Sequence, residues 1–190
     1  KKIISLVLSG AMLVSLASCT TPETTVPEQI PTETVPSESV ETEPEETEPS
    51  IMGFNMIENG DFSDTDPENP WHTYFEGGDG LMYINDKGEL QFDCKIVGIK
   101  EHSNQIYYDG FSLYQNCQYE IQFDAYSDVE HVISYRIQIN GSDYHAYSEE
   151  YITVGPEVTH FDIVFTMEEA SDPAPRLCFN MGKFEENEGL

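Results

Sequence analysis

The sequence predicts an all-β fold, an antiparallel β-sandwich, and three observations lead to this prediction. From Trp71 onward, apolar and polar residues alternate with a period of two, which is the pattern of half-buried strands. Turn sequences such as NDKG, YYDG and INGSD separate the alternating runs. No run repeats with the period of a long helix. Many short strands separated by turns are typical of sandwich folds.

The first alternating run is WHTYF, in which Trp71, Thr73 and Phe75 are expected to face the core while His72 and Tyr74 face away. Five later runs place apolar residues on one face in the same way, within residues 90–96, 119–125, 133–139, 161–165 and 177–181. The opposite faces of the third and fifth of these runs carry Arg136, Gln138 and Asn140, and Asn180 beside Arg176 and Cys178. Each strand thus offers one apolar face and one polar or aromatic face.

The chain opens with KKIISLVLSGAMLVSLASCT, two lysines followed by an apolar run and then small residues. This order predicts an export signal over residues 1–18. LASC, residues 16–19, resembles the lipobox of bacterial lipoproteins, which implies cleavage before Cys19 and attachment of a diacylglycerol to its thiol. Acyl chains hold a protein on a membrane, so we expect an extracytoplasmic, surface-exposed protein. The alternative is a plain secretory signal with an incidental cysteine.

Residues 19–50 are expected to form a linker from the anchored Cys19. From residue 20 this stretch has no aromatic and no basic residue, and prolines recur every few positions. Such a composition cannot bury enough apolar surface to offset its conformational entropy. Its prolines and mutually repelling glutamates favour an extended spacer. Residues 51–190, which have the size of one domain, follow it.

The charge balance restricts the partners. The chain has eight Lys and Arg residues against 36 Asp and Glu residues, a formal net charge of −28. Nucleic-acid binding relies on cationic groups that displace counterions, so no nucleic-acid partner is expected. Anionic membranes and acidic polysaccharides are disfavoured for the same reason. We expect a neutral partner and a monomeric protein.

The sequence gives no support for catalysis or for zinc. Cys94, Cys117 and Cys178 have no close spacing of the zinc-binding kind; one pair could form a disulfide, or all could be small buried residues. The sequence lacks a G-x-S-x-G motif, a phosphate loop and an H-E-x-x-H motif. Adjacent acids such as Glu149 and Glu150 alternate across a strand and do not share a site easily.

Several motifs occur in a fixed order: NMIENGDFS, a Trp followed three residues later by Tyr, GEL, QIYYDGFSL, YEIQFDAYS, INGSDY and RLCFNMGKF. Together they resemble the carbohydrate-binding modules of families 4 and 9, over about residues 55–184. The resemblance implies a jelly-roll sandwich of galactose-binding-like topology, in which Asn55 to Ser63 form the first strand and turn. Such modules are commonly attached to enzymes that degrade β-glucans or xylan.

The resemblance also implies a cleft on one sheet, where aromatic rings stack on sugar rings and amides bind hydroxyls. It places Tyr74 and Tyr144 at stacking positions, and Asn140, Asn180 and Gln105 at amide positions. His102 stands where the family usually has Trp or Tyr, a departure that weakens stacking. Arg136, on the same predicted face, completes the candidate set. For each of these residues the alternative is an ordinary solvated strand position.

Many members of this family carry a structural calcium. The resemblance assigns two ligands, the carboxylate of Asp61 and the backbone carbonyl of Gly88, and oxygen ligands suit calcium. The alternative for Asp61 is a turn acid that bonds its own backbone. A third ligand and a final strand of the family have no counterpart here, so residues 51–190 are expected to lack the last strand of the sandwich.

These observations predict non-catalytic binding of a neutral plant-type polysaccharide, β-glucan or xylan, at the bacterial cell surface, with no required cofactor. The module would target an attached glycoside hydrolase, whose domain we expect elsewhere in the full-length protein. Two alternatives belong to other classes. One is a catalytic β-sandwich hydrolase or lyase acting on such glycans, and the other is a surface adhesion domain without a sugar site.

Overall fold

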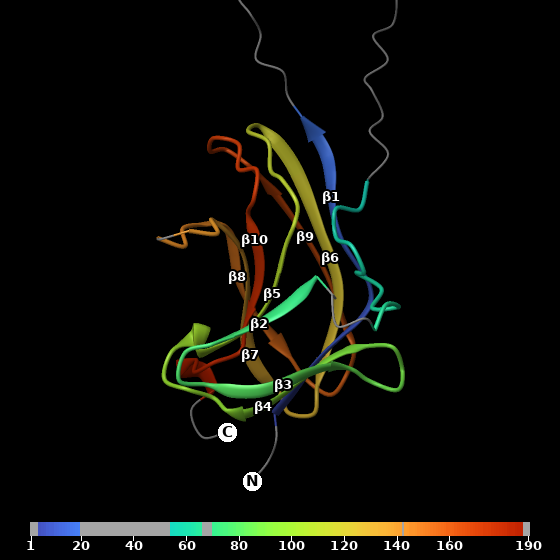
Figure 1. Ribbon diagram of the computed structural model, residues 1–190, viewed down its shortest axis with the longest axis vertical. Helices are drawn as coiled ribbons and strands as arrows, with labels where there is room; N and C mark the ends of the chain where they lie inside the picture. The colour runs from blue at the N-terminus through green and yellow to red at the C-terminus, as the bar shows by residue number, and fades with distance from the viewer. Residues whose placement is uncertain (1–3, 20–53, 66–69, 142, 188–190) are drawn as a thin grey trace, which may run out of the picture.

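The computed structural model describes residues 4–19, 54–65, 70–141 and 143–187, and shows two five-stranded antiparallel sheets packed face to face (Figure 1). One sheet has the order β3-β4-β1-β6-β9 and the other the order β2-β5-β10-β7-β8. The strands are β1 (Ile4–Cys19), β2 (Trp71–Phe75), β3 (Asp79–Ile84), β4 (Leu90–Ile96), β5 (Asn104–Asp109), β6 (Cys117–Ser127), β7 (His131–Gln138), β8 (Ala146–Val154), β9 (Thr159–Thr166) and β10 (Arg176–Asn180). Two short 3-10 turns, η1 (Glu101–Ser103) and η2 (Glu185–Asn187), complete the described elements. The predicted all-β sandwich is confirmed.

The core lies between the two sheets and follows the predicted alternation. On β7, Ile133, Tyr135 and Ile137 are fully buried, as the period-two pattern predicts. Phe123 on β6 meets Phe179 on β10 edge to face, with ring centroids 5.1 Å apart, so the two inner faces interlock. Trp71 is buried against Tyr108, which also faces the core. Most predicted inward positions are therefore core positions, but Phe75 and Ile96, at the ends of β2 and β4, are exposed, so the prediction was wrong for these two strand ends.

The segment expected to begin the module, Asn55 to Ser63, is not a strand. Turns occupy residues 58–61, and Asn59 and Phe62 adopt left-handed backbone conformations that do not continue a strand. Phe62 is nevertheless buried, and its ring lies 5.8 Å from that of Trp71. This part of the prediction was wrong: the segment is a turn-rich flap that covers the core next to Trp71.

Residues 4–18, predicted to be an export signal, belong to β1 in the structure together with Cys19. Ile4 to Leu8 pair with β4, and the part of β1 from Leu6 to Cys19 pairs with β6, with two register shifts. Strand β1 thus lies in the interior of its sheet, between β4 and β6 (Figure 1). Cleavage before Cys19 would remove this strand. Residues 1–3 of the predicted signal and residues 20–50 of the predicted linker lie outside the described residues.

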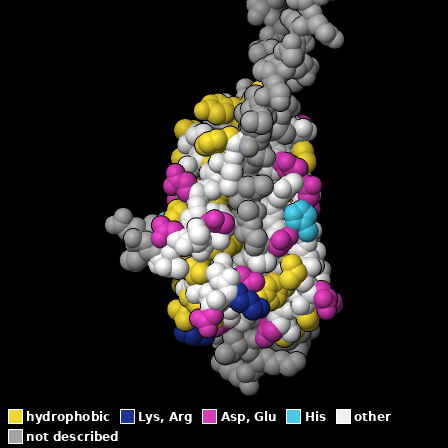
Figure 2. Space-filling view, turned by 90° about the vertical axis from the view of Figure 1, so that its right-hand side faces the viewer, with side chains coloured by type: hydrophobic (Ala, Val, Ile, Leu, Met, Phe, Trp, Pro, Cys, Tyr) yellow, Lys and Arg dark blue, Asp and Glu magenta, His cyan; other side chains and the backbone are white. Residues whose placement is uncertain are grey.

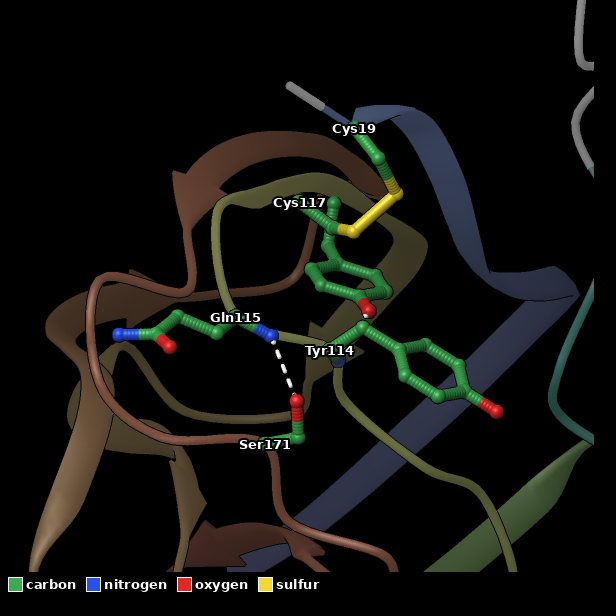
Figure 3. Close-up of a disulfide and its surroundings, with 6 residues drawn as sticks. Cys19, Tyr114, Gln115, Cys117 and Ser171 are labelled. Atoms are coloured by element: carbon green, nitrogen blue, oxygen red, sulfur yellow. Dashed lines mark hydrogen bonds between the residues drawn. A yellow bond between two sulfur atoms is a disulfide. The ribbon is translucent and has the colours of Figure 1, made fainter. Parts of the chain in front are cut away.

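Two cysteines are joined and two are free. Cys19 at the end of β1 forms a disulfide with Cys117 at the start of β6, and Figure 3 shows the bond near Tyr114. A sulfur in a disulfide cannot also carry the predicted diacylglycerol, so the two states of Cys19 exclude each other. Cys94 and Cys178 are free and buried, which agrees with the expectation of small buried residues.

The described surface is acidic, as the composition predicts. Figure 2 shows Asp and Glu side chains spread over one face of the molecule, with few Lys or Arg side chains among them. Among the described residues, no helix is long and apolar enough to cross a membrane.

Candidate functional site

A cleft of about 310 Å³ opens on the outer face of the sheet β2-β5-β10-β7-β8. Four of its strands and the loops at their ends supply the lining. The lining residues are Tyr74, Glu76, His102, Gln105, Arg136, Gln138, Asp143, Tyr144 and Arg176. Aromatic, amide and charged groups thus meet at one site, and we take this cleft as the candidate functional site.

Strand register explains why these residues meet. Directly opposed residues on paired strands share a face, and three rows run across the sheet on the outer face. The first row is Tyr74, Gln105, Asn180, Ser134, Tyr151. The second row is His72, Tyr107, Cys178, Arg136, Glu149. The third row is Asp109, Arg176, Gln138, Ala146. On β2, β5, β10 and β7 each row is two residues from the next, so the three rows face the same way on these strands; on β8 a register shift opposite Gln138 interrupts this spacing.

The first row is held together by amide hydrogen bonds. Gln105 Nε2 donates to Asn180 Oδ1 over 2.7 Å, and Asn180 Nδ2 donates to Ser134 Oγ over 3.0 Å. Asn180 and Ser134 are buried, whereas Tyr74 at the edge of the row is 44% exposed. Asn180 therefore fixes the Gln105 side chain, which lines the cleft, and Tyr74 presents an open aromatic surface beside it.

Both arginines of the chain line the cleft, and each is paired with an acid. Arg136 Nε lies 3.0 Å from Glu149 Oε1, and a terminal nitrogen of Arg176 lies 3.2 Å from Asp109 Oδ2. The Arg176 guanidinium also stacks over the Tyr107 ring, 3.8 Å from its centroid. The pairing offsets the positive charge and fixes the orientation of the planar guanidinium groups. The cleft thus offers ordered N–H donors with little net charge from the arginines.

Two further groups on the floor of this face are buried. Gln138 is almost fully buried, and its Oε1 accepts no hydrogen bond within the described protein. An unsatisfied buried acceptor beside a cleft is suited to a ligand donor. Burial raises the pKa of the Cys178 thiol to about 12, so this cysteine stays a neutral thiol at physiological pH. Cys178 is accordingly a buried packing residue beneath the cleft and does not act as a nucleophile.

The ends of the cleft are formed by loops. At one end Glu76 accepts a hydrogen bond from Lys100 over 2.5 Å and lies 3.1 Å from His102 Nε2. The hydrogen bond from Lys100 lowers the pKa of Glu76, which favours its ionised form. At the other end Tyr144 is 51% exposed and has a left-handed backbone, φ 49°. Arg136 donates to the carbonyl of Tyr144 over 3.1 Å, which helps to hold this unusual conformation.

Five of the residues selected from the sequence line this cleft: Tyr74, Tyr144, Gln105, His102 and Arg136. Two selected residues do not. Asn180 lies buried next to Gln105 in the first row, and Asn140 is exposed beyond the strand, with a 3.4 Å hydrogen bond to Asp109. Asn180 is thus buried and Asn140 exposed, although the resemblance places both at amide positions of the cleft.

Sequence reasoning did not select Glu76, Asp143, Gln138 or Arg176, which also line the cleft. The alternation did place Gln138 and Arg176 on the polar face, so a signal existed for both. Glu76 and Asp143 lie outside the strands, where alternation carries no information about direction. Only the folded loops bring these two acids to the cleft.

The predicted calcium ligands have local partners. Asp61 Oδ1 accepts hydrogen bonds from the backbone N–H and the hydroxyl of Ser63, so this carboxylate closes its own turn. Gly88 lies in the turn between β3 and β4 with φ +78°, a conformation that favours glycine. No group of three or more His, Cys, Asp or Glu residues in the described part of the chain is placed to hold a metal ion. Calcium binding stays a prediction from the resemblance.

Comparison with known proteins agrees with this description. A family model for a carbohydrate binding domain, of families 4 and 9, matches residues 55–188. No curated protein sequence matches the chain. A solved structure described as "CBM4 structure and function" has a similar fold, with a TM-score of 0.60, 21% sequence identity, and coverage of 67% of this chain and 89% of that one. At this identity the likeness concerns the fold alone.

Proposed function

Because the chain belongs to the carbohydrate binding domains of families 4 and 9, we propose that the cleft on the β2-β5-β10-β7-β8 sheet binds a neutral β-linked polysaccharide. The domain is a non-catalytic carbohydrate-binding module of all-β sandwich fold. The proposal adds the location of the site and the class of glycan, β-glucan or xylan, to that assignment.

One observation carries the proposal: the three cross-strand rows put an open tyrosine, ordered amides and charge-paired arginines on a single face. Sugar rings have apolar faces that stack on aromatic rings, and Tyr74 and Tyr144 offer exposed aromatic surface in the cleft lining. Sugar hydroxyls both donate and accept, which matches the N–H donors of Arg136 and Arg176 and the acceptor Oε1 of Gln138.

The charges of the cleft favour a neutral glycan over an acidic one. Glu149 and Asp109 offset the two arginines, and Glu76 and Asp143 add further negative charge to the lining. A uronic-acid polymer would approach a protein of formal net charge −28, and its carboxylates would compete with protein acids for the arginines. Like charges disfavour such an association.

Replacement of Tyr74, an exposed tyrosine of the cleft lining, tests the proposal. Tyr74→Ala is expected to weaken binding to soluble β-glucan or xylan by about tenfold, which corresponds to roughly 1.4 kcal/mol for one lost aromatic contact. The matched control is Tyr114→Ala, because Tyr114 is an exposed tyrosine at the disulfide end of the molecule and is not part of the cleft lining. Affinity electrophoresis and calorimetry on both glycans, with polygalacturonate as the acidic comparison, measure the effect.

Equal binding by Tyr74→Ala and wild-type protein would refute the assignment of the cleft. Binding to polygalacturonate in preference to the neutral glycans would refute the assignment of the glycan class. If Tyr114→Ala lost binding and Tyr74→Ala kept it, the sugar site would lie outside this cleft, near the disulfide.

We further propose that the module acts at the bacterial cell surface, held through acylated Cys19, and directs an attached glycoside hydrolase to its glycan. The lipobox-like LASC and the spacer composition of residues 20–50 support this setting. Fatty-acid labelling in a bacterial host tests the anchor. Cys19→Ser should abolish the label, and unchanged labelling would refute acylation at this cysteine.

A further inference from the structure

The position between β4 and β6 is filled by a segment that lies far away in the sequence. Strand β1 pairs with β4 on one side and β6 on the other. Without β1, this sheet would consist of two separate pairs, β3-β4 and β6-β9. The facing edges of β4 and β6 would then expose unpaired N–H and C=O groups, which bind extended chains readily.

The described side chains of β1 fit this position on both faces. Leu6 and Leu8 are buried and belong to the core cluster, while Val7 between them points to the outer face and is also buried. The register places Val7 opposite Gln91 on β4 and Tyr126 on β6. An interior strand covered on both faces requires an apolar sequence of this kind.

Polar contacts fix the register at the start of the strand. Ser5 Oγ donates to Asp93 Oδ1 over 2.6 Å, and the Ser5 backbone N–H donates to Asp128 Oδ1 over 3.0 Å. A slip by one residue would turn Leu6 and Leu8 outward and place Val7 in the core. The position therefore selects an extended segment by side-chain pattern as well as by backbone pairing.

Two covalent connections tie β1 to the other strands, the chain through residues 20–53 and the Cys19–Cys117 disulfide. The other strands that the structure describes lie within residues 71–180, and the described part of the flap that covers Trp71 begins at residue 54. Figure 3 shows Cys19 at the end of β1 with its sulfur bonded to Cys117. The disulfide joins β1 to its neighbour β6, so β1 cannot leave its position between β4 and β6 while the disulfide is intact.

We propose that the position between β4 and β6 is a binding site for an extended apolar peptide, and that residues 4–19 are its exchangeable occupant in the uncleaved chain. The ligand class is a strand with apolar side chains on both faces and a hydroxyl side chain opposite Asp93. Reduction of the Cys19–Cys117 disulfide removes the covalent link that holds residues 4–19 to β6. Cleavage before Cys19 would remove the occupant and leave Cys117 as a thiol beside an open site.

The test uses the full chain with a protease recognition sequence inserted between residues 30 and 40. After cleavage, dithiothreitol reduces the disulfide to two thiols and is itself oxidised to a cyclic disulfide. A fluorescent peptide of residues 4–19, with Cys19→Ser and a terminal lysine tag for solubility, is then added in excess. We expect uptake of one peptide per protein, at least tenfold more than by the uncut oxidised chain.

Two variants keep the result specific. The same peptide with Leu8→Asp should be taken up at least tenfold less, because the aspartate would enter the core. The cut chain with Cys117→Ser should take up the parent peptide without any reductant. Dimers of the uncut reduced chain that exchange their N-terminal segments would also support the site, since the second copy supplies the same strand.

No uptake by the cut and reduced protein, while far-ultraviolet circular dichroism shows an unchanged β fold, would overturn the proposal. Unfolding on reduction that the added peptide does not reverse would also overturn it, because a binding site must accept its ligand. Equal uptake of the parent and Leu8→Asp peptides would show nonspecific adsorption and would overturn it as well. These results do not depend on glycan binding, which is measured separately.

Discussion

Replacement of Asn180 by Ala should destabilise the domain and weaken glycan binding together. The Asn180 side chain accepts from Gln105 and donates to Ser134, and the residue is 1% exposed. Asn180→Ala removes both bonds at once. Ser134 is fully buried and cannot reach water, whereas Gln105 borders the cleft and can partly rehydrate. A buried group without a partner costs about 1–3 kcal/mol, so we expect a loss of about 2–3 kcal/mol in the free energy of unfolding.

Urea denaturation and thermal melting measure this loss, which corresponds to a decrease of about 10 °C in Tm for a domain of this size. Binding to the preferred glycan should weaken several-fold, because Gln105 is no longer held in the cleft. Asn140→Ala is the matched control, since Asn140 is exposed and has a long hydrogen bond to Asp109; its effect on unfolding should stay below about 0.5 kcal/mol. If Asn180→Ala has the same free energy of unfolding as the wild type, the hydrogen bonds of Asn180 do not stabilise the sheet.

Three other predictions concern the core, a histidine and calcium. Trp71→Ala should lower the free energy of unfolding by about 3–5 kcal/mol through a core cavity, and a loss below about 1 kcal/mol in urea denaturation would contradict its position between Phe62 and Tyr108. Burial lowers the pKa of His131, so the unfolded chain binds its proton more readily. The free energy of unfolding should therefore fall as the pH drops through 6.5, the ordinary pKa of histidine. His131→Asn should remove this part of the pH dependence. Identical profiles of unfolding free energy against pH for the variant and the wild type would show that His131 is not responsible. Thermal melts of this chain with calcium and with chelator should coincide, because the resemblance assigns only two ligands, Asp61 and Gly88, and a clear rise of Tm with calcium would show a complete site.

The strands with strong alternation could be predicted from the sequence, whereas β3, β5 and the polar edge strand β8 were not among the predicted runs. In β7 the core residues Ile133, Tyr135 and Ile137 each follow a polar or less bulky neighbour, so the pattern is unambiguous. Strand β8 has the sequence AYSEEYITV and lies at the edge of its sheet. Edge strands carry charged residues because one side has no strand partner. The same charges obscure the alternation that would otherwise identify the strand.

The candidate site divides in a similar way. Residues on strands could be assigned to the cleft face by parity, because Tyr74, Gln105 and Arg136 each oppose another residue of that face across the sheet. The difference between Asn140 and Asn180 could not be predicted, since β7 ends at Gln138 and parity no longer applies beyond it. Cross-strand pairing, which depends on the whole fold, decides which polar residues share a row.

The N-terminal segment shows why a local pattern can support two assignments. An export signal needs an apolar run, and an interior strand covered on both faces needs the same composition. Apolar Leu6, Val7 and Leu8 satisfy both requirements, so hydropathy alone does not separate them. The discriminating residues are polar and lie elsewhere in the sequence: Asp93 and Asp128 bind Ser5, and they do so only if the segment lies between β4 and β6. Removal of these two acids should therefore weaken the binding of the strand without any effect on its use as an export signal.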